Sequence, residues 1–439
     1  MENNFLEKKF RLKKAGTDTR TELMAGLTTF MTMSYILIVN PSILSETGMD
    51  KGAVFTATIV SSVIAMLVMA LYANLPFGLA PGMGLNAFFT YTVVLSFGKT
   101  WEFALTAVFL EGIIFILLSL FSVREAIFTS IPIVLKNAVS VGIGLFIAFI
   151  GFSNAGVIGQ GDGVILTLGN LLTKNTFVFF FALFLMAFLT AKGVKGALLI
   201  GIVGSTVVAV ILGVSSLPTQ SIFSLPPDIG PVVFKLKFDH IFTFEMFSIM
   251  FTFLFVDMFD TIGTLTGVAT KAGMLDEEGR LPNASHALMA DAIGTTVGAL
   301  LGTSTVTTFV ESASGVADGG RTGLTALSTA FFFFISLFFF PLFSIVPPES
   351  TAAALVIVGL FMMSPIKEIN FNDFTESVPA FLTITMMPFA YSIAEGISFG
   401  IMSYVLLKLL TGKKKEITPM IAVLAIIFFL RILSPLFPF

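Results

Sequence analysis

LPFGLAPGMGLN (residues 75–86) and GTSTVTTFVESASG (residues 302–315) are two interrupted apolar stretches that resemble each other. Each begins with a pattern that favours an extended backbone and ends with one that favours a short helix. Asn86 and Glu311 stand 225 residues apart (311 − 86). Paired interrupted segments at matching places in two halves of a membrane protein point to a transport site near the middle of the bilayer. The alternative is that both stretches are ordinary loops containing glycine.

The composition around these stretches predicts an all-α polytopic membrane protein. Of 439 residues, 56% are hydrophobic and 12% are charged, whereas soluble domains carry about 25% charged residues. A soluble enzyme, a disordered chain and a disulfide-stapled module are therefore disfavoured, the last also because cysteine is absent. The net charge of −3 gives no reason to expect a nucleic-acid partner. Continuous apolar blocks favour spanning helices over alternating barrel strands.

The apolar blocks predict fourteen membrane segments, of which the third and the tenth are the interrupted stretches. Because these two are separated by seven segments, an odd number, the two halves are expected to have opposite orientations. We expect a tail at 1–20, a first repeat at 21–214, an extracytoplasmic loop at 215–245 and a second repeat at 246–411. The segments are 21–40, 53–73, 84–97, 101–121, 126–150, 164–190, 196–214, 246–270, 285–301, 304–317, 322–346, 350–364, 374–391 and 394–411.

Basic residues set the expected orientation. The positive-inside rule places the N-terminal tail in the cytoplasm, and with fourteen crossings the C-terminal region as well. The basic residues expected inside are Lys8, Lys9, Arg11, Lys13, Lys14, Arg20, Arg124, Lys192, Lys195, Lys271, Arg280, Arg321, Lys367 and Lys413–Lys415. Within the C-terminal region, 412–439, the stretch 417–436 is expected to be an interfacial helix on the membrane surface, with a fifteenth span as the alternative.

Acidic residues inside apolar segments are the candidates for a site. Asp257 and Asp260 lie three residues apart on one face of an expected helix, and a carboxylate in hydrocarbon is functional by default. Glu311 begins the second short helix, where free N–H groups are exposed. Asn86 can both donate and accept hydrogen bonds. This combination suits a flat, neutral ligand with several N–H and C=O groups better than an anion. As an alternative, Asp257 or Asp260 could cap a helix or accept a hydrogen bond from a nearby hydroxyl group.

Other polar residues carry weaker signals. Glu111, Asp291 and Glu395 lie in or near expected spans, and a structural role and a place in a proton path are both open for them. His240 and His286 have no metal-ligand spacing. We therefore expect neither a metal nor a cofactor, and the usual residues of a membrane enzyme are missing.

Three motifs carry a resemblance to a known family. APGMGLN (80–86), VDMFDTIGT (256–264), and TVTTFVES (305–312) followed by GGRTGLTA (319–326) resemble the azaguanine-type purine permeases, the adenine, guanine and hypoxanthine branch of the nucleobase–cation symporters. The similarity runs from about Lys8 to about Thr411. It implies two inverted repeats of seven segments, with segments 1–4 and 8–11 forming a core domain and segments 5–7 and 12–14 forming a gate domain.

The same resemblance implies roles for individual residues. Asp257 and Glu311 would hydrogen-bond a purine, Asn86 would support or contact it, and Asp260 would tune the eighth helix. Proton coupling would involve these three acids, because burial of a pair favours proton uptake by one of them. Main-chain groups around three further residues would complete the pocket, namely Phe88, Phe309 and Val310.

The implied function is proton-coupled uptake of purine nucleobases by alternating access. The protein would be a homodimer in the cell (inner) membrane, with both termini cytoplasmic, and it would not be an enzyme. The alternative is a transporter of the same architecture for an anion such as sulfate or a carboxylate. That alternative would need a basic residue near the broken helices, and none occurs within 75–97 or 302–317.

Overall fold

The computed structural model describes residues 5–120, 131–161, 163–217, 221–275 and 281–433. Arg124 and Arg280, which the orientation argument uses, lie outside the described residues. So do the start of the segment expected at 126–150 and the end of the stretch expected at 417–436.

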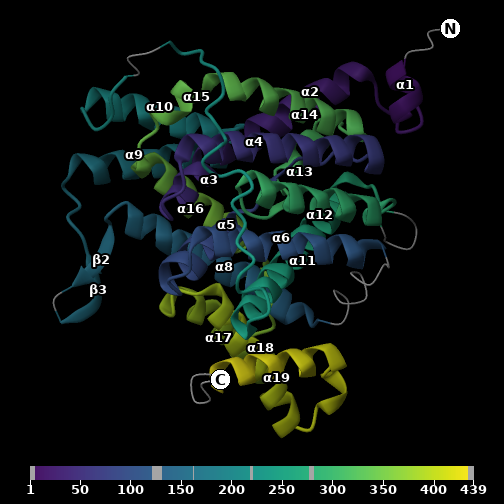
Figure 1. Cartoon of the computed structure of the whole chain (residues 1–439), viewed down its shortest axis with the longest axis vertical. Helices are drawn as coiled ribbons and strands as arrows, with labels where there is room; N and C mark the ends of the chain where they lie inside the picture. The colour runs from purple at the N-terminus through teal and green to yellow at the C-terminus, as the bar shows by residue number, and fades with distance from the viewer. Residues whose placement is uncertain (1–4, 121–130, 162, 218–220, 276–280, 434–439) are drawn as a thin grey trace.

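The first half of the chain is helical apart from one short strand and one hairpin (Figure 1). Its elements are α1 (Phe5–Phe10), α2 (Thr19–Met33), α3 (Ile36–Ser45), α4 (Lys51–Val68), η1 (Met69–Ala73), β1 (Leu79–Pro81), α5 (Met83–Ala87), η2 (Phe88–Ser96), α6 (Trp101–Leu120), α8 (Ile133–Asn154), β2 (Ile158–Gly161), β3 (Val164–Leu168), α9 (Lys174–Ala191) and α10 (Ala197–Ile211).

The second half repeats the pattern of long helices around one short strand. Its elements are α11 (Phe244–Ala272), α12 (Ala284–Leu301), β4 (Val306–Thr308), α13 (Ser312–Ala317), α14 (Gly323–Ser336), η3 (Leu337–Phe339), α15 (Phe340–Ser344), α16 (Pro348–Met362), η4 (Ser364–Glu368), α17 (Phe374–Phe389), α18 (Ile393–Leu410), η5 (Lys414–Glu416) and α19 (Pro419–Leu433).

Polar side chains fix where several helices begin. Asp18 accepts a hydrogen bond from Thr21 N at 3.0 Å, and Asp50 accepts one from Ala53 N at 2.8 Å. Thr243 caps α11 in the same way through Met246 N. Each of these bonds satisfies a backbone N–H that has no partner within its own helix.

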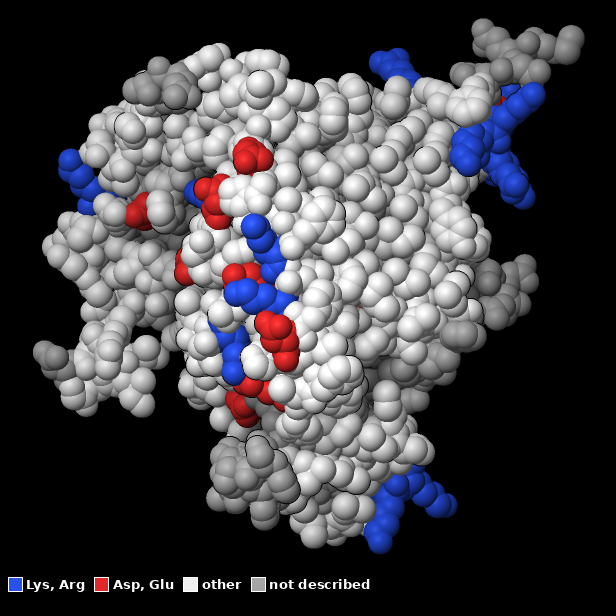
Figure 2. Space-filling view, in the orientation of Figure 1, with Lys and Arg blue, Asp and Glu red and all other residues white. Residues whose placement is uncertain are grey.

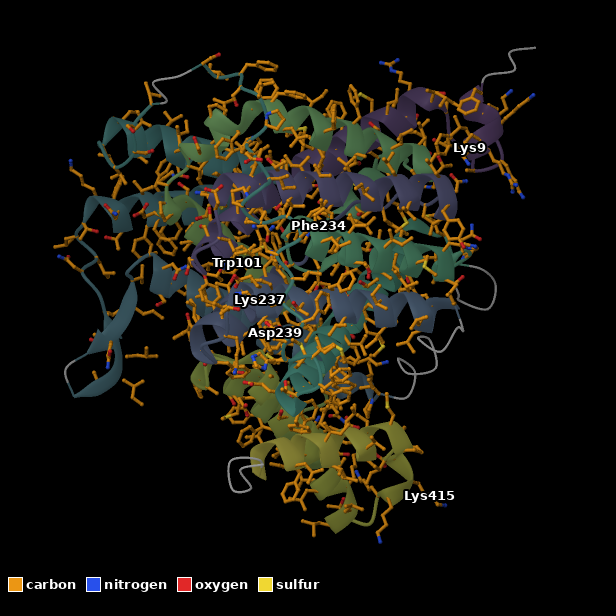
Figure 3. All side chains as sticks on the ribbon, viewed as in Figure 1. Lys9, Trp101, Phe234, Lys237, Asp239 and Lys415 are labelled. Carbon is orange, nitrogen blue, oxygen red and sulfur yellow. The ribbon has the colours of Figure 1, made fainter. Side chains whose placement is uncertain are left out.

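Nine helical stretches in the described part of the chain are long and apolar enough to cross a membrane. In Figure 2, charged side chains form a column down the left-centre of the view and smaller groups at the right-hand border, with a broad uncharged band between them. Lys9 and Lys415 lie toward the right-hand border, and Lys237 and Asp239 lie in the middle of the view (Figure 3). This distribution is that of a multi-pass membrane protein. The count of fourteen segments stays a prediction.

The helices pack in two groups. α2, α3, α4, α6, α11, α12, α13 and α14 pack mainly on one another, and α8, α9, α10, α16, α17 and α18 form the second group. The groups contain the segments expected in a core and in a gate, and we use those names for them below. The sequence boundaries of the two repeats stay predictions.

The two interrupted stretches cross in the middle of the core group. β1 and β4 pair antiparallel, with Leu79 opposite Thr308 and Pro81 opposite Val306. Each strand leads into a short helix, α5 or α13, as the sequence predicts. The alternative of ordinary glycine-containing loops is therefore wrong.

Three expected segments differ from the structure. Residues 164–168, expected to begin a helix, form strand β3, because Gly163 at φ 78° turns the chain back to pair with β2. The first segment continues to Ser45 and is interrupted by a turn at 34–35 between α2 and α3. The segment at 322–346 is divided into α14, η3 and α15, with a proline near the start of α15.

Candidate substrate site at the crossing of two broken helices

Main-chain and side-chain bonds tie the two broken segments together. Gly82 N donates to Thr305 O at 3.0 Å, and Phe309 N donates to Gly78 O at 2.9 Å. Ser312 Oγ accepts a hydrogen bond from Gly78 N at 3.0 Å. The two segments thus form one rigid unit from which both short helices start.

Asn86 joins this unit through its side chain. It is fully buried, and its Oδ1 accepts a short hydrogen bond from Ser304 Oγ in the other broken segment. The amide thus links the first short helix to the stretch before β4. The acceptor oxygen of Asn86 therefore faces protein in this structure, and the contact with a purine that the resemblance implies stays a prediction.

Glu311 precedes the first residue of α13 and is held from the first segment. Tyr35 Oη donates to Glu311 Oε1 at 2.8 Å, and Thr32 Oγ1 donates to the Glu311 carbonyl at 3.4 Å. Tyr35 lies in the turn between α2 and α3 and is 1% exposed. Sequence analysis did not select Tyr35. The available signal was a tyrosine among the hydroxyl residues of an otherwise apolar span.

Asp260 lies beside the crossing. Its Oδ2 accepts a hydrogen bond from Thr307 of β4 at 3.4 Å, and a Cβ at Gly82 would stand 3.4 Å from the same oxygen. The carboxylate interacts electrostatically with Asp291 of α12 and with Glu311. Further along the same face of α11, Gly263 and Gly267 border open space within the described part of the structure, where no heavy atom would come within 4 Å of a Cβ.

Asp257 has different surroundings. It is fully buried, and its Oδ1 accepts a hydrogen bond from Thr261 Oγ1 at 3.2 Å. The same hydroxyl lies 3.0 Å from both carboxylate oxygens of Asp291 on α12. Asp260 therefore lies beside the broken helices and interacts electrostatically with both Asp291 and Glu311, whereas Asp257 is linked to Asp291 through Thr261 in the packing between α11 and α12.

The three remaining predicted residues are distributed around the crossing. Phe88 is fully buried and meets Phe253 of α11 edge to face, with ring centroids 4.7 Å apart. Phe309 is buried, whereas Val310 is 50% exposed. Of these, Val310 next to Glu311 presents the most open surface.

Two further buried polar side chains hold the second broken segment. Glu111 of α6 accepts from Thr305 Oγ1 at 3.0 Å, and Asn40 of α3 donates to Thr303 Oγ1 at 2.9 Å. Buried polar groups need such partners, and a satisfied network rigidifies its surroundings. Among the described residues, no group of three or more His, Cys, Asp or Glu side chains could hold a metal ion.

Two short half-helices that start from a strand crossing inside a bundle of spanning helices, with acids beside them, define a membrane transporter. The sequence model described as the permease family (Xan_ur_permease) matches residues 20–399. The chain belongs to this family. It is accordingly a permease and not an enzyme.

Individual proteins that are similar over nearly the full chain are also permeases. Over 98% of this chain and 97% of the relative, the sequence is 41% identical to the adenine permease AdeQ of Escherichia coli (strain K12). It is 43% identical to the guanine/hypoxanthine permease PbuG of Bacillus subtilis (strain 168), over 96% of this chain and 98% of the relative. The fold is that of the transmembrane domain of the cyanobacterial bicarbonate transporter BicA, with a TM-score of 0.62 at 17% identity over 86% of this chain and 97% of that chain.

Proposed function

We propose that this protein takes up purine nucleobases by proton symport, with the core group moving against the gate group. One observation carries the proposal: Asp260 beside β4 and Glu311 at the start of α13 both lie at the crossing of the two broken segments, where the sequence has no basic residue within 75–97 or 302–317. Two carboxylates accept hydrogen bonds from ligand N–H groups and repel an anion. Relatives named adenine and guanine/hypoxanthine permeases support the substrate class.

The roles that we propose for the site residues differ from those implied by the resemblance. We propose that Glu311 and Asp260 face the purine, with main-chain groups around Val310 beside them. Asp257 does not contact the purine in this proposal and acts through its hydrogen bond with Thr261. Asn86 holds the two broken segments together. The open face of α11 at Gly263 and Gly267 is the proposed path from Asp260 toward the cytoplasm.

The proposed setting is the cell membrane, with the N-terminal tail in the cytoplasm. The basic tail and the positive-inside rule support this orientation. The proposed homodimer would form through the gate group, where α9 presents Phe177, Phe184 and Phe188 outward. Cross-linking in the membrane tests that contact directly.

An anion is the second candidate substrate, because a solved structure that shares this fold is the transmembrane domain of a bicarbonate transporter. The acids at the crossing disfavour it, since carboxylates close to a bound anion raise its energy. Sulfate or bicarbonate uptake that purines do not inhibit would support the anion instead.

Transport by purified protein in liposomes tests the proposal. Labelled hypoxanthine, guanine and adenine should accumulate when an inward proton gradient is imposed, with uracil, xanthine and sulfate as competitors. Glu311→Gln should abolish accumulation while the variant still reconstitutes normally. An uptake rate that does not change with the imposed proton gradient would contradict proton coupling. Normal uptake by Glu311→Gln would contradict the proposed site.

A further inference from the structure

α19 carries one charged residue, Arg431 near its end, and is apolar on all sides before it. No charged residue occurs within 419–430. The side chains on one face are buried against the protein, and those on the other are about half exposed; the buried ones include Ile421, Leu424 and Phe428, and the exposed ones are Val423, Ile426, Phe429 and Leu430. A helix that is apolar all round lies in protein or lipid and not along a water boundary.

The start of α19 lies where α18 ends and α17 begins. Lys408, near the end of α18, makes a short ion pair with Glu416 of the connecting turn. Lys413 in the same turn pairs with Asp373, the cap of α17, at 2.7 Å. Lys415, labelled in Figure 3, marks this end of the helix pair. These ionic contacts fix the start of α19 at the charged border that also carries Lys415.

α11 begins at the opposite end of the bundle. Glu245 in its first turn pairs with Lys99 at 2.7 Å, just past the end of η2. Tyr91 of η2 meets Tyr391, in the turn between α17 and α18, with ring centroids 6.1 Å apart. The start of α11 and the α17–α18 turn therefore share one end, and the start of α19 lies at the other.

Phe428 of α19 nevertheless reaches Phe251 of α11, with ring centroids 6.4 Å apart. At 1.5 Å per residue, Phe251 is about 10 Å from the start of α11 and about 30 Å from its other end. α19 continues for five more residues after Phe428, or about 8 Å. Its 15 residues, about 22 Å, therefore lead from the end that carries Lys415 toward the end at which α11 begins.

We infer that α19 is an additional membrane-crossing segment whose exposed stripe contacts lipid chains, and that its last turn lies toward the face opposite Lys413–Lys415. With 15 residues, α19 is as long as α10, which belongs to the gate group. The three lysines before it satisfy the positive-inside rule, because they stay on the cytoplasmic side. This proposal favours the alternative of a fifteenth span over the expected interfacial helix.

The absence of cysteine makes the test direct. Single cysteines are introduced by Lys415→Cys, by Lys14→Cys, by Thr167→Cys in the β2–β3 hairpin and by adding one residue after Phe439. A membrane-impermeant maleimide is applied to intact cells and then to permeabilised cells. Thr167 is the matched reference for the side opposite Lys415. Asn154, at the end of α8 and just before the hairpin, donates a hydrogen bond to Tyr91 Oη at 3.0 Å. The hairpin therefore lies at the same end of the bundle as the turn between α17 and α18.

The added C-terminal cysteine should behave like T167C, with nearly equal labelling before and after permeabilisation. K415C and K14C should gain most of their labelling only afterwards. Grouping of the C-terminal cysteine with K415C overturns the inference. An epitope after Phe439, probed with external protease, repeats the measurement without cysteine. Neither readout depends on the transported substrate.

Discussion

Tyr35 donates a hydrogen bond to Glu311 at 2.8 Å across 276 residues of sequence. The bond occupies Oε1 of the carboxylate and fixes the direction in which the second oxygen points. A hydrogen bond to a charged group contributes about 1.5–3 kcal/mol, which corresponds to about 10- to 100-fold in an equilibrium. Tyr35 is thus a positioning residue for the proposed purine contact.

Tyr35→Phe should lower the ratio of maximal uptake rate to KM about tenfold, mostly through KM. The phenyl ring keeps the packing, so thermal stability should change little. In a double-mutant cycle with Glu311→Gln, Tyr35→Phe should add little further loss, because it acts through Glu311. A full additional loss in the double variant would show that Tyr35 acts independently of Glu311.

Much of this arrangement could be predicted from local sequence. The proline and glycine residues of 75–86 and 302–315 interrupt apolar segments, and this pattern predicts broken helices with Glu311 at a helix start. The Tyr35–Glu311 bond could not be predicted in this way, because it joins two segments that only the tertiary fold brings together. Likewise, the apolar run 164–168 resembles the start of a span until Gly163 turns it into a hairpin.

The sequence alone could not show which of the two aspartates, Asp257 or Asp260, lies beside the broken segments. Asp257 and Asp260 share one face of an ideal helix, so periodicity cannot separate them. Their neighbours do: Thr307 of β4 contacts Asp260, whereas Thr261 contacts both Asp257 and Asp291. The contrast depends on how α11 is rotated against β4 and α12.

Asp260→Asn and Asp257→Asn should therefore fail in different ways. Asp260→Asn should raise the KM for purine at least tenfold, because it changes a group that faces the ligand. Asp257→Asn should lower the maximal rate and thermal stability, because it disturbs a buried network. Equilibrium binding and thermal unfolding of both purified variants measure the contrast. Loss of binding in Asp257→Asn with normal binding in Asp260→Asn would restore the original assignment of Asp257.

Lys195 and Asp318 connect the gate to the core at the turn between α9 and α10. Lys195 Nζ lies 2.5 Å from both oxygens of Asp318, and Thr28 Oγ1 donates to the same carboxylate at 2.6 Å. Although partial burial opposes ionisation, the hydrogen bonds from Lys195 and Thr28 hold the pKa of Asp318 below its ordinary 3.8. The pair is therefore intact at neutral pH, and its contribution is lost only as the pH falls through that lowered pKa.

Lys195→Gln should change the maximal uptake rate about two- to fivefold, because a partly exposed ion pair contributes at most about 1 kcal/mol. The KM should stay within about twofold of the original value, since neither residue touches the proposed site. The charge reversal Lys195→Asp with Asp318→Lys should recover most of the rate. Equal losses in the single and reversed variants would argue against an ionic link between gate and core.

Gly315 and Gly263 offer a matched test of packing against access. A Cβ at Gly315 in α13 would overlap Thr29 Oγ1 and Ala25 O of α2, whereas one at Gly263 would meet nothing within 4 Å. Gly315→Ala should therefore destabilise the protein by about 1–3 kcal/mol through overpacking. Gly263→Ala should leave thermal stability unchanged or raise it, because alanine favours the helix by up to about 1 kcal/mol.

Uptake by Gly263→Ala should nevertheless fall, since the added methyl group enters the proposed path from Asp260. Thermal unfolding and purine uptake of both variants separate the two effects. Normal uptake by Gly263→Ala would remove this face of α11 from the path.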